Sequence, residues 1–536
     1  MAATSKEVAV FNDAIGLSAP DVSRDRRMRV WAARLYYCNC LRVLILERLM
    51  LCRRECADVF ANDIFRRHFS VMTIVRKCAL SIFIYVVLAS SASAPARATE
   101  PAQDETLAYN IGVQTYIYGF PMMDLYQTLW ETSFDPNRGH DRTVNEFFNF
   151  ERLITSKDDW VVTPNEDTIY SRMFFDLRKE PMILVIPPTT RQYWFPISDI
   201  RHDFDANLSW DTVGARGGAF ALCAPGWQGV LPGGVERVDM GTPLGWMLPR
   251  FAVNGDTDLP GALEVQKQVR FIPLSQWGAA GVMRPKPDSA DFPRFTRNEL
   301  TNAKEYFTTL NTLLRLSPRF GHPVDEAMAG WLREIGMHPA TKFDWEILSP
   351  QTQRGLERAA TDAHKAITDR MPRVVPIINN WQIVRLDKRM SGEPMVAAAG
   401  AMLGLLWNPK DVSTYDVAFL DGSGSPLDGR NRYVIRFQEQ PPVNAFWSLT
   451  MYSTETQIFV PNAINRYSVG NRTDGTVVGK DGSIEIFLQA DEPSDPQERT
   501  NWLPAPKGPF YLLIRHYSPK SAILTGDWLP PPVTKR

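Results

Sequence analysis

Two stretches of the chain consist of short apolar runs separated by proline and glycine, and they limit the possible fold more than any other feature. Runs of about four to eight β-branched and aromatic residues, bounded by turn residues, are typical of strands. The runs lie at 169–177, 182–186 and 193–197 in the first stretch, and at 433–437, 445–452, 483–489 and 509–517 in the second. The 40 prolines and the aromatic content of 11% also favour short strands over a helical bundle.

Between these stretches the apolar residues recur at helical spacing. Three amphipathic segments occupy 300–314, 324–335 and 353–367. Helical spacing also occurs at 105–132, where Gly119 and Pro121 interrupt the run, so we expect a helix, a break and a second helix. No glycine pattern of a nucleotide-binding loop precedes any of these segments. The predicted fold class is therefore mainly β with α, with two β-rich domains joined by a helical segment.

Residues 72–98 have the pattern of a secretory signal peptide. Arg76 and Lys77 form a basic flank, residues 78–88 are an uncharged apolar stretch, and Ala96-Arg97-Ala98 supplies small residues before Thr99. The apolar stretch is shorter than the ~20 residues that a membrane-spanning helix needs. We therefore expect cleavage before Thr99, no membrane span in the mature protein, and a periplasmic or secreted location.

The 71 residues before this signal are unusual, because a secretory signal stands at the start of a chain. We expect Met72 to be the true start and residues 1–71 to be a spurious N-terminal extension. Five of the six cysteines lie within the first 98 residues, and only Cys223 lies beyond them. The mature chain thus has no internal disulfide, and its histidines are not at zinc-ligand spacing, so we predict no metal site.

The charge of the mature part argues against a nucleic-acid partner. Residues 1–98 carry 15 basic and 8 acidic side chains, whereas the rest of the chain carries 44 basic and 52 acidic side chains. Binding to phosphate backbones needs a basic face, which a net-acidic body does not favour. A small molecule or a protein partner remains open, as do the cofactor and the oligomeric state.

Several long motifs resemble a known bacterial family. They are TYIYGFP at 115–121, TPNEDTIYSRMFFDL at 163–177, EPMILVIP at 180–187, LDGRNRYVIRF at 427–437, FWSLTMYSTETQIFVPNAINRYSVGNRT at 446–473, DGSIEIFLQ at 481–489 and NWLPAPKGPFYLLIRHYSPK at 501–520. This family is defined by two tandem domains of unknown function, numbered 1254 and 1214. The resemblance implies two β-sandwich or jelly-roll-like domains with a helical connection, often in exported proteins.

The resemblance and the patterns together give a domain plan for the mature chain. We expect an N-terminal β-rich domain with leading helices at 99–285, which is 1254-like. A helical connector follows at 286–380, and a C-terminal β-sandwich domain, which is 1214-like, occupies 381–536.

The first candidate site follows Pro164, between two strand signals. Asp167 is a candidate general base or ligand-orienting carboxylate, and Tyr170 is a candidate hydrogen-bond donor. Asn165 is a candidate ligand contact. The alternative is that Asn165 and Asp167 only cap local backbone groups in an Asx-turn.

The second candidate site surrounds His202, which is flanked by carboxylates at 199, 203 and 205. A histidine with an unperturbed pKa near ~6.5 suits acid–base catalysis. Arg201 is a candidate ligand contact beside it. The alternative is a solvated loop with internal salt bridges.

Three further candidates lie in the C-terminal domain. Arg466 and Arg515 are candidates for clamping a carboxylate or phosphate, and Trp502 offers a stacking face for a sugar or an aromatic ring. The alternative is that the tryptophans fill the core and the arginines tie loops together.

These features favour an exported binding protein that holds a small ligand or partner between two β-domains. The alternative function is a periplasmic hydrolase or lyase that uses Asp167, Tyr170 and His202. Convergence of Asp167 and His202 with an arginine in one deep pocket would favour the enzyme, and their scatter over separate loops would argue against it.

Overall fold

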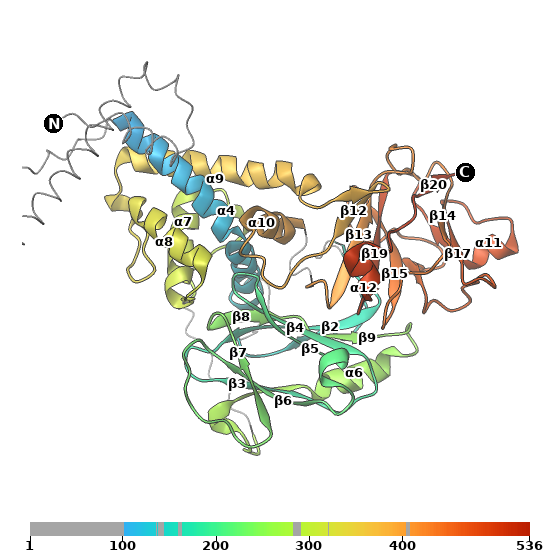
Figure 1. The fold of residues 1–536 in the computed structure, drawn as a ribbon, viewed down its shortest axis with the longest axis horizontal. Coiled ribbons are helices and arrows are strands. Elements are labelled where there is room, and N and C mark those ends of the chain that lie inside the picture. The colour runs from blue at the N-terminus through green and yellow to red at the C-terminus, as the bar shows by residue number, and fades with distance from the viewer. Residues whose placement is uncertain are drawn as a thin grey trace, which may run out of the picture. The chain divides into compact units, whose positions relative to one another are not determined.

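A computed structural model describes residues 101–135, 137, 144–158, 163–281, 291–319, 321–403 and 408–536. The predicted signal peptide at 72–98 and the predicted extension at 1–71 lie outside the described residues. The described part contains an N-terminal β-sandwich, a group of helices and a C-terminal β-sandwich (Figure 1). The predicted fold class is confirmed.

The N-terminal sandwich is built from a six-stranded and a four-stranded sheet. The first contains β1 (Phe148–Asn149), β2 (Thr168–Asp176), β8 (Leu244–Met247), β4 (Tyr193–Asp199) and β5 (Phe204–Ser209), with β9 (Arg250–Ala252) pairing with β2 and β4. The second contains β10 (Arg270–Pro273), β3 (Met182–Ile186), β6 (Gly218–Cys223) and β7 (Val235–Asp239). Phe175 and Phe195 of one sheet and Leu184 and Leu222 of the other share one buried apolar cluster, so the core lies between the sheets.

The C-terminal sandwich repeats this arrangement with different strands. Its six-stranded sheet has the order β11 (Ile377–Ile378), β12 (Trp381–Val384), β13 (Ser413–Ala418), β19 (Phe510–Tyr517), β15 (Trp447–Ser453) and β16 (Ser468–Gly470). Its four-stranded sheet has the order β18 (Trp502–Pro504), β17 (Ile484–Gln489), β14 (Tyr433–Phe437) and β20 (Thr534–Lys535). Trp447 and Ile514 of the first sheet and Ile435 and Leu488 of the second belong to one buried cluster.

A third apolar core lies among five helices of the described part. They are α4 (Pro101–Ser133), α7 (Ala303–Leu316), α8 (Pro323–Glu334), α9 (Pro350–Arg370) and α10 (Pro394–Leu403). Figure 1 shows α4 and α9 crossing within this group. The other α-helices that the structure describes are short: α5 (Trp210–Val213), α6 (Leu259–Gln268), α11 (Pro496–Thr500) and α12 (Ser521–Thr525).

The predicted break in the first helical segment is wrong, because α4 runs through Pro121 as one helix. Proline removes one backbone hydrogen bond, at a typical cost of ~3 kcal/mol. Burial compensates for that loss, since Phe120, Met122 and Met123 are almost completely enclosed by the other helices. Gly119 allows the close approach, because a Cβ at this position would lie 2.5 Å from a methyl carbon of Leu310.

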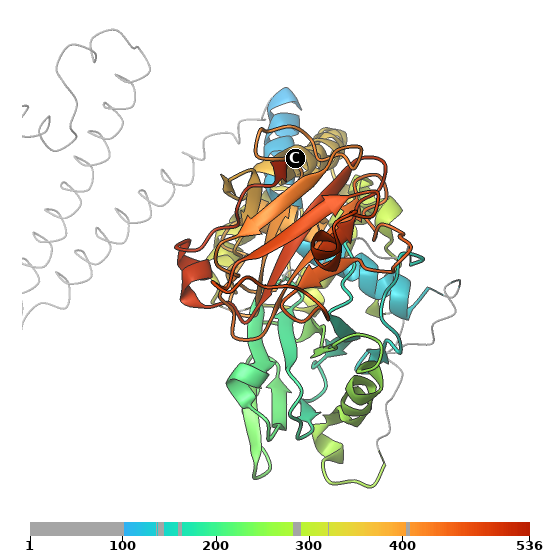
Figure 2. The same cartoon turned by 90° about the vertical axis from the view of Figure 1, so that its right-hand side faces the viewer.

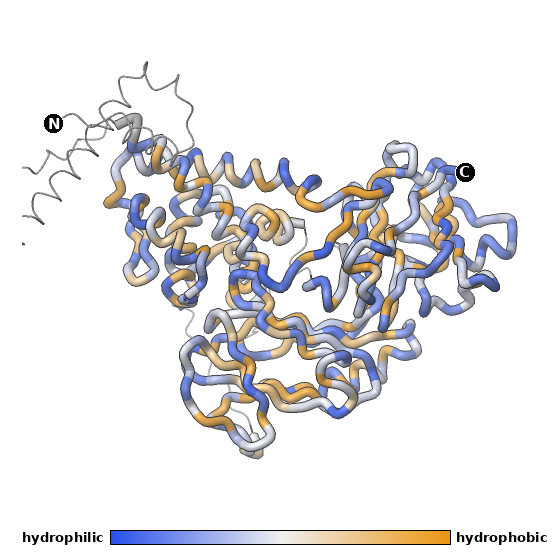
Figure 3. The backbone as a smooth tube through the Cα atoms, in the orientation of Figure 1, coloured by the Kyte–Doolittle hydropathy of each residue, from blue (hydrophilic) through white to orange (hydrophobic). Residues whose placement is uncertain are grey.

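The six-stranded sheet of the C-terminal sandwich has two different faces, because successive side chains along a strand point to opposite sides. One face carries the apolar core, and Figure 3 shows apolar and polar residues within these strands. The other face carries Tyr415, Arg515 and Ser448, which are neighbours in the strand register. The same face also carries Val417, Tyr511 and Leu513 of a smaller apolar cluster. Its polar side chains contact the N-terminal sandwich, which lies below the C-terminal sandwich in Figure 2.

None of the described helices combines the length and the apolar character that crossing a membrane requires.

Candidate functional site

Asn165 links the two sandwiches at the start of β2. Its Nδ2 lies 2.9 Å from Tyr170 Oη and 2.8 Å from Tyr517 Oη, and thus joins β2 to β19. Its Oδ1 accepts a hydrogen bond of 3.0 Å from the backbone N–H of Asp167, which is the Asx-turn contact. The two interpretations of Asn165 are therefore compatible, since one end of the amide shapes the loop and the other reaches the tyrosines.

Arg515 fixes the loop that precedes Asn165. Its Nη2 donates to the carbonyl oxygens of Thr163 and Pro164 at 3.0 and 3.2 Å, and its Nη1 donates to Tyr452 Oη at 2.7 Å. Tyr452 Oη in turn donates to the carbonyl of Pro164 at 2.5 Å. Arg515 is thus a buried tie between the sandwiches, and its hydrogen bonds go to protein groups.

Tyr170 and Arg250 lie opposite each other in the register of β2 and β9. The Arg250 guanidinium carbon is 5.4 Å from the centre of the Tyr170 ring, which is cation–π distance. Burial by itself raises the pKa of Tyr170, but Arg250, Arg515 and hydrogen bonds from Thr168 and Asn165 outweigh burial and lower that pKa. Burial raises the pKa of Tyr517 well above its ordinary range, and the neighbouring Tyr170 adds to this effect. The two phenols therefore differ in acidity, although they share Asn165.

Asp167 and Glu166 point toward β15 and β16 of the C-terminal sandwich. Ser448 Oγ donates to Asp167 Oδ2 at 2.5 Å, and Ser468 Oγ donates to Glu166 Oε1 at 2.7 Å. Burial raises the pKa of Glu166 to about 8, against the opposing effect of the Ser468 hydrogen bond. The Asp167 carboxylate is thus hydrogen-bonded to a serine hydroxyl and does not face a space large enough for a substrate.

A cleft of about 450 Å³ borders this contact. It is lined by both sandwiches: Thr189, Thr190, Arg191, Gln192, Ala252, Asn254, Asp258, Gly261 and Val265 come from the N-terminal one and Arg472 from the C-terminal one. We call it the junction cleft.

Two arginines with different surroundings line the junction cleft. Arg191 forms a two-pronged ion pair with Asp258, at 2.6 and 2.8 Å, and these hydrogen bonds lower the pKa of Asp258 to about 2. The Arg472 guanidinium carbon lies 3.3 Å from the centre of the Phe446 ring, and Arg472 donates to the carbonyl of Asp167 at 3.1 Å. The Asp167 carboxylate is 3.9 Å from Arg472, beyond hydrogen-bond distance.

His202 and Arg201 lie elsewhere, in the turn between β4 and β5. Asp199 Oδ1 accepts the backbone N–H groups of Arg201 and Asp203 and so holds this turn. His202 has a positive φ of 68° and is buried, and burial lowers its pKa to about 4. A histidine that stays neutral at pH 7 and is enclosed in this way is unsuited to proton exchange with a substrate.

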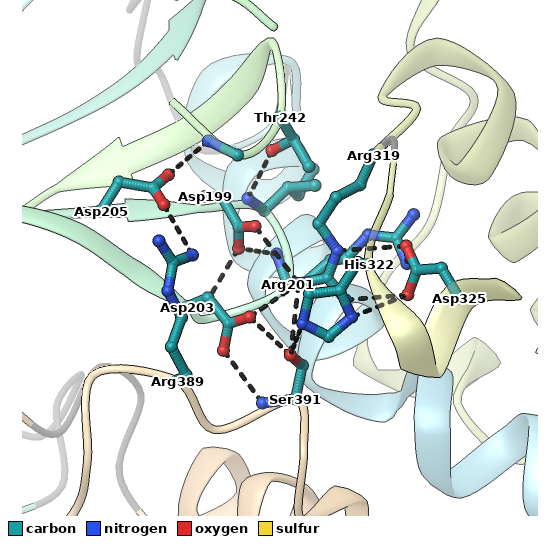
Figure 4. A network of polar contacts seen from close by, with 12 residues as sticks. Asp199, Arg201, Asp203, Asp205, Thr242, Arg319, His322, Asp325, Arg389 and Ser391 are labelled. Carbon is teal, nitrogen blue, oxygen red and sulfur yellow. Dashed lines mark hydrogen bonds and ion pairs between the residues drawn. The ribbon is translucent and has the colours of Figure 1, made fainter. Parts of the chain in front are cut away.

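Arg201 instead belongs to a network of ion pairs, which Figure 4 shows. Arg201 and Arg319 both bind Asp325, at 2.6 and 2.8 Å, and Arg319 also binds Asp203 at 2.6 Å. Ser391 Oγ lies 2.5 Å from Asp203 Oδ2. The network therefore ties the β4–β5 turn to the start of α8 and to the segment before α10.

A serine and a histidine meet in this network, but the space beside them is too small for a substrate. Ser391 Oγ is 3.3 Å from His322 Nε2, and His322 Nδ1 is 3.9 Å from Asp325 Oδ1. The adjoining cavity is about 10 Å³, which is roughly one water. Ser391 also donates to Asp203 rather than pointing into an open space. The network is therefore a structural cross-link.

Arg466 and Trp502 lie away from the junction cleft and serve the C-terminal sandwich. Arg466 Nη1 donates to the carbonyls of Thr500 and Trp502, each at 3.0 Å. Trp502 is 6% exposed, and its Nε1 donates to the carbonyl of Gln489 at 2.8 Å. These contacts correspond to the alternative in which arginines tie loops together and tryptophans fill the core.

The structure thus brings Asn165, Asp167, Tyr170 and Arg515 together and separates them from His202. Sequence reasoning missed Arg250, although one signal was present. Arg250 follows Pro249 and precedes apolar residues in a short run. A charged residue inside a buried strand is uncommon and indicates a specific role.

In the described part of the chain, no group of three or more histidine, cysteine, aspartate or glutamate side chains is placed to hold a metal ion.

Comparison with known families finds both domains. A domain described as a protein of unknown function, DUF1254, matches residues 144–273, and a second domain of unknown function, DUF1214, matches residues 412–521. The predicted tandem and its order are confirmed. No curated protein matches the chain.

Two solved structures are similar to this chain. A crystal structure of a protein from Vibrio parahaemolyticus aligns with a TM-score of 0.63 at 24% identity, over 80% of this chain and 100% of that one. A structure of an uncharacterized protein from Burkholderia cenocepacia aligns with a TM-score of 0.38 at 12% identity, over 82% of this chain and 96% of that one. The first shows that the fold also occurs in the Vibrio protein.

Proposed function

We propose that this chain, which carries the DUF1254 and DUF1214 domains in tandem, is an exported protein that binds a small anionic molecule in the junction cleft. The observation that carries the proposal is the lining of the cleft. Two guanidinium groups and one carboxylate face it, so its lining has a net charge of +1 from Arg191, Arg472 and Asp258. A concave space with a few convergent polar groups is the usual form of a ligand site.

Arg472 supplies a charge that is only weakly compensated, since Asp167 and Asp258 interact with it electrostatically without a hydrogen bond. Its side chain is 20% exposed, and burial lowers its pKa below the ordinary value of arginine. Its hydrogen bond goes to a backbone carbonyl, and the carboxylate oxygen of Asp167 is 3.9 Å away. A partly dehydrated cation of this kind gains from a charge-assisted hydrogen bond to a bound anion.

Arg191 contributes more to the shape of the junction cleft than to its charge. Asp258 neutralises it and orients its guanidinium plane, and Arg191 Nη1 also donates to the carbonyl of Ala252 at 2.6 Å. A side chain held in this way loses little conformational entropy when a ligand arrives. The volume of about 450 Å³ lies toward the small end of known ligand sites, which run from roughly 300 to 1,000 Å³. The ligand class is therefore a small polar anion.

The separation of His202 from Asp167 and Tyr170 favours binding over the predicted hydrolase or lyase. His202 lies in the β4–β5 turn, whereas the other two side chains lie at the contact between the sandwiches. An acid–base pair has to reach the same substrate. Export rests on the sequence of residues 72–98, with its basic flank, apolar stretch and small residues before Thr99.

Calorimetric titration of the purified protein with inorganic phosphate, succinate and citrate tests the binding site. We expect at least one of these anions to bind, with an affinity that falls as salt is added. Arg472→Gln should weaken binding about tenfold or more, because it removes a charge-assisted hydrogen bond. Arg430→Gln is the control, since Arg430 is an exposed arginine of the same sandwich. Unchanged affinity in Arg472→Gln, or no binding of any of the three anions, would overturn the proposal.

A further inference from the structure

Arg250 is a buried cation with unused hydrogen-bond donors. Its exposure is 5%, and its Nε and Nη1 have no hydrogen-bond partner among the described residues. Arg250 pairs with Tyr170 on one side and with Trp194 on the other in the strand register, so the three side chains lie on the same face of the sheet. A buried donor without a partner is destabilising, and such groups call for an explanation.

Arg250 has no ion-pair partner of its own among the described residues, whereas Asp167 and Glu166 interact electrostatically with its neighbour Arg515. Arg515 is a second buried cation close enough to repel it electrostatically. Among the residues that the structure describes, neither arginine has a carboxylate within ion-pair distance. Two buried cations without a counter-ion are costly unless another group compensates them. The unused donors of Arg250 therefore offer a place for one anion.

Tyr170 is the ionisable side chain that faces Arg250 in the strand register. Arg250 of β9 and Arg515 of β19 favour its phenolate form against the effect of burial. The phenols of Tyr415 on β13 and Tyr517 on β19 also lie near Arg250 and interact with it electrostatically. Asn165 Nδ2 donates to the Tyr170 Oη.

Aromatic rings pack beside Arg250, which is paired with Trp194 in the strand register. The Trp194 ring is 5.0 Å from the Tyr517 ring, and the Phe446 ring stacks on Tyr517 at 4.4 Å. These side chains share one buried apolar cluster with Ala252. Apolar walls favour an anion of one charge on an apolar body, because a doubly charged phosphate loses far more hydration on entry. A carboxylic acid with a hydrocarbon body has this chemistry.

We propose that Arg250 is an inner carboxylate site, separate from the junction cleft, in which the guanidinium binds the carboxylate of an apolar acid and the Tyr170 hydroxyl donates a hydrogen bond to it. The bound carboxylate brings a negative charge beside the Tyr170 phenol, so it raises the pKa of that phenol. The inference does not depend on the cleft proposal, because the two sites use different arginines.

Ultraviolet titration of the tyrosinate absorbance tests this site on the wild-type protein. One tyrosine should titrate below the ordinary range, and Tyr170→Phe should remove that component. Cyclohexanecarboxylate, which does not absorb in this region, should raise the midpoint of that tyrosine by about one pH unit, since a nearby charge shifts a pKa by ~1–3 units. The neutral cyclohexanecarboxamide and inorganic phosphate should leave the midpoint unchanged.

Two variants separate this site from the cleft. Arg250→Met should abolish the effect of cyclohexanecarboxylate, whereas Arg472→Gln should keep it. If Arg250→Met does not fold, the comparison of carboxylate with carboxamide on the wild-type protein still decides. The proposal is overturned if the carboxylate leaves the midpoint unchanged, if the amide or phosphate shifts it equally, or if Arg472→Gln rather than Arg250→Met removes the effect.

Discussion

At the scale of single residues, buried carboxyl groups set the pH response of this protein. Burial raises the pKa of Asp124 and Asp199 to about 7 and that of Glu166 to about 8. Such a group holds its proton more tightly in the folded than in the unfolded chain. Its contribution to stability is complete below the unfolded pKa and is lost as the pH rises through the folded pKa. The stabilising contribution of these three carboxyl groups should therefore fall between about pH 4 and about pH 8.

Glu166→Gln isolates one of these groups. The variant keeps a polar side chain near Ser468 but cannot ionise, so its stability should fall less than that of the wild type as the pH rises from about 4.5 to about 8. The difference at the upper end should be on the order of 3 kcal/mol, since each unit of pKa shift corresponds to ~1.4 kcal/mol and part of it is screened. Urea unfolding at several pH values measures it.

The matched control is Glu264→Gln, which changes an exposed carboxylate on α6. Its stability should follow the wild type at every pH. If the stability of the wild type and of Glu166→Gln changed equally with pH, Glu166 would be ionised in the folded protein throughout this range.

At the scale of elements, glycine determines how closely α4 and α9 approach. A Cβ at Gly355 of α9 would lie 2.6 Å from the carbonyl oxygen of Glu105 and 2.9 Å from the Cβ of Ala108. A Cβ at Gly112 of α4 would lie 2.7 Å from the Cβ of Ala359. The helices thus contact each other backbone to backbone, which larger side chains would prevent.

Gly355→Ala should destabilise the protein by about 1–3 kcal/mol, because the helices must separate to accept the methyl group. Gly330→Ala in α8 is the control, since the nearest atom to its added Cβ is the mobile end of Arg333 at 4.0 Å. That substitution should stabilise α8 by up to about 1 kcal/mol through helix propensity. Chemical unfolding compares the two, and a Gly355→Ala variant as stable as Gly330→Ala would contradict the close packing.

At the scale of the whole molecule, buried polar contacts connect the three regions. The ion-pair network of Arg319 joins the N-terminal sandwich to the helices, and Asn165, Asp167 and Arg515 join it to the C-terminal sandwich. Buried hydrogen-bonded groups of this kind favour one relative arrangement, because any other arrangement leaves a charge or a donor unpaired.

Export is also a property of the whole chain, and intact mass measurement tests it. Protein isolated from the fraction outside the cytoplasm of its own host should have a mass that begins at Thr99. Ala96→Asp puts a charge three residues before the cleavage point and should leave the segment attached. A mass that includes residues 1–98 in the exported wild-type protein would contradict the predicted signal peptide.

The sequence by itself determined the local structure of this protein. Met182–Ile186 and Tyr433–Phe437 form strands with the predicted bounds, because β-branched and aromatic residues with turn residues around them carry that preference locally. The helical segments at 324–335 and 353–367 also lie within one residue of, or inside, α8 and α9.

Only the tertiary structure decided which polar residues meet. Asn165 and Tyr517 are 352 residues apart in the chain and are joined by one hydrogen bond, whereas Arg201 and His202, adjacent in the chain, face different surroundings. Pro121 stays inside α4 because surrounding helices bury its neighbours. The physical reason is the same in each case. Strand and helix preference depends on near neighbours, but the burial of a charge and the partner it finds depend on segments that only folding brings together.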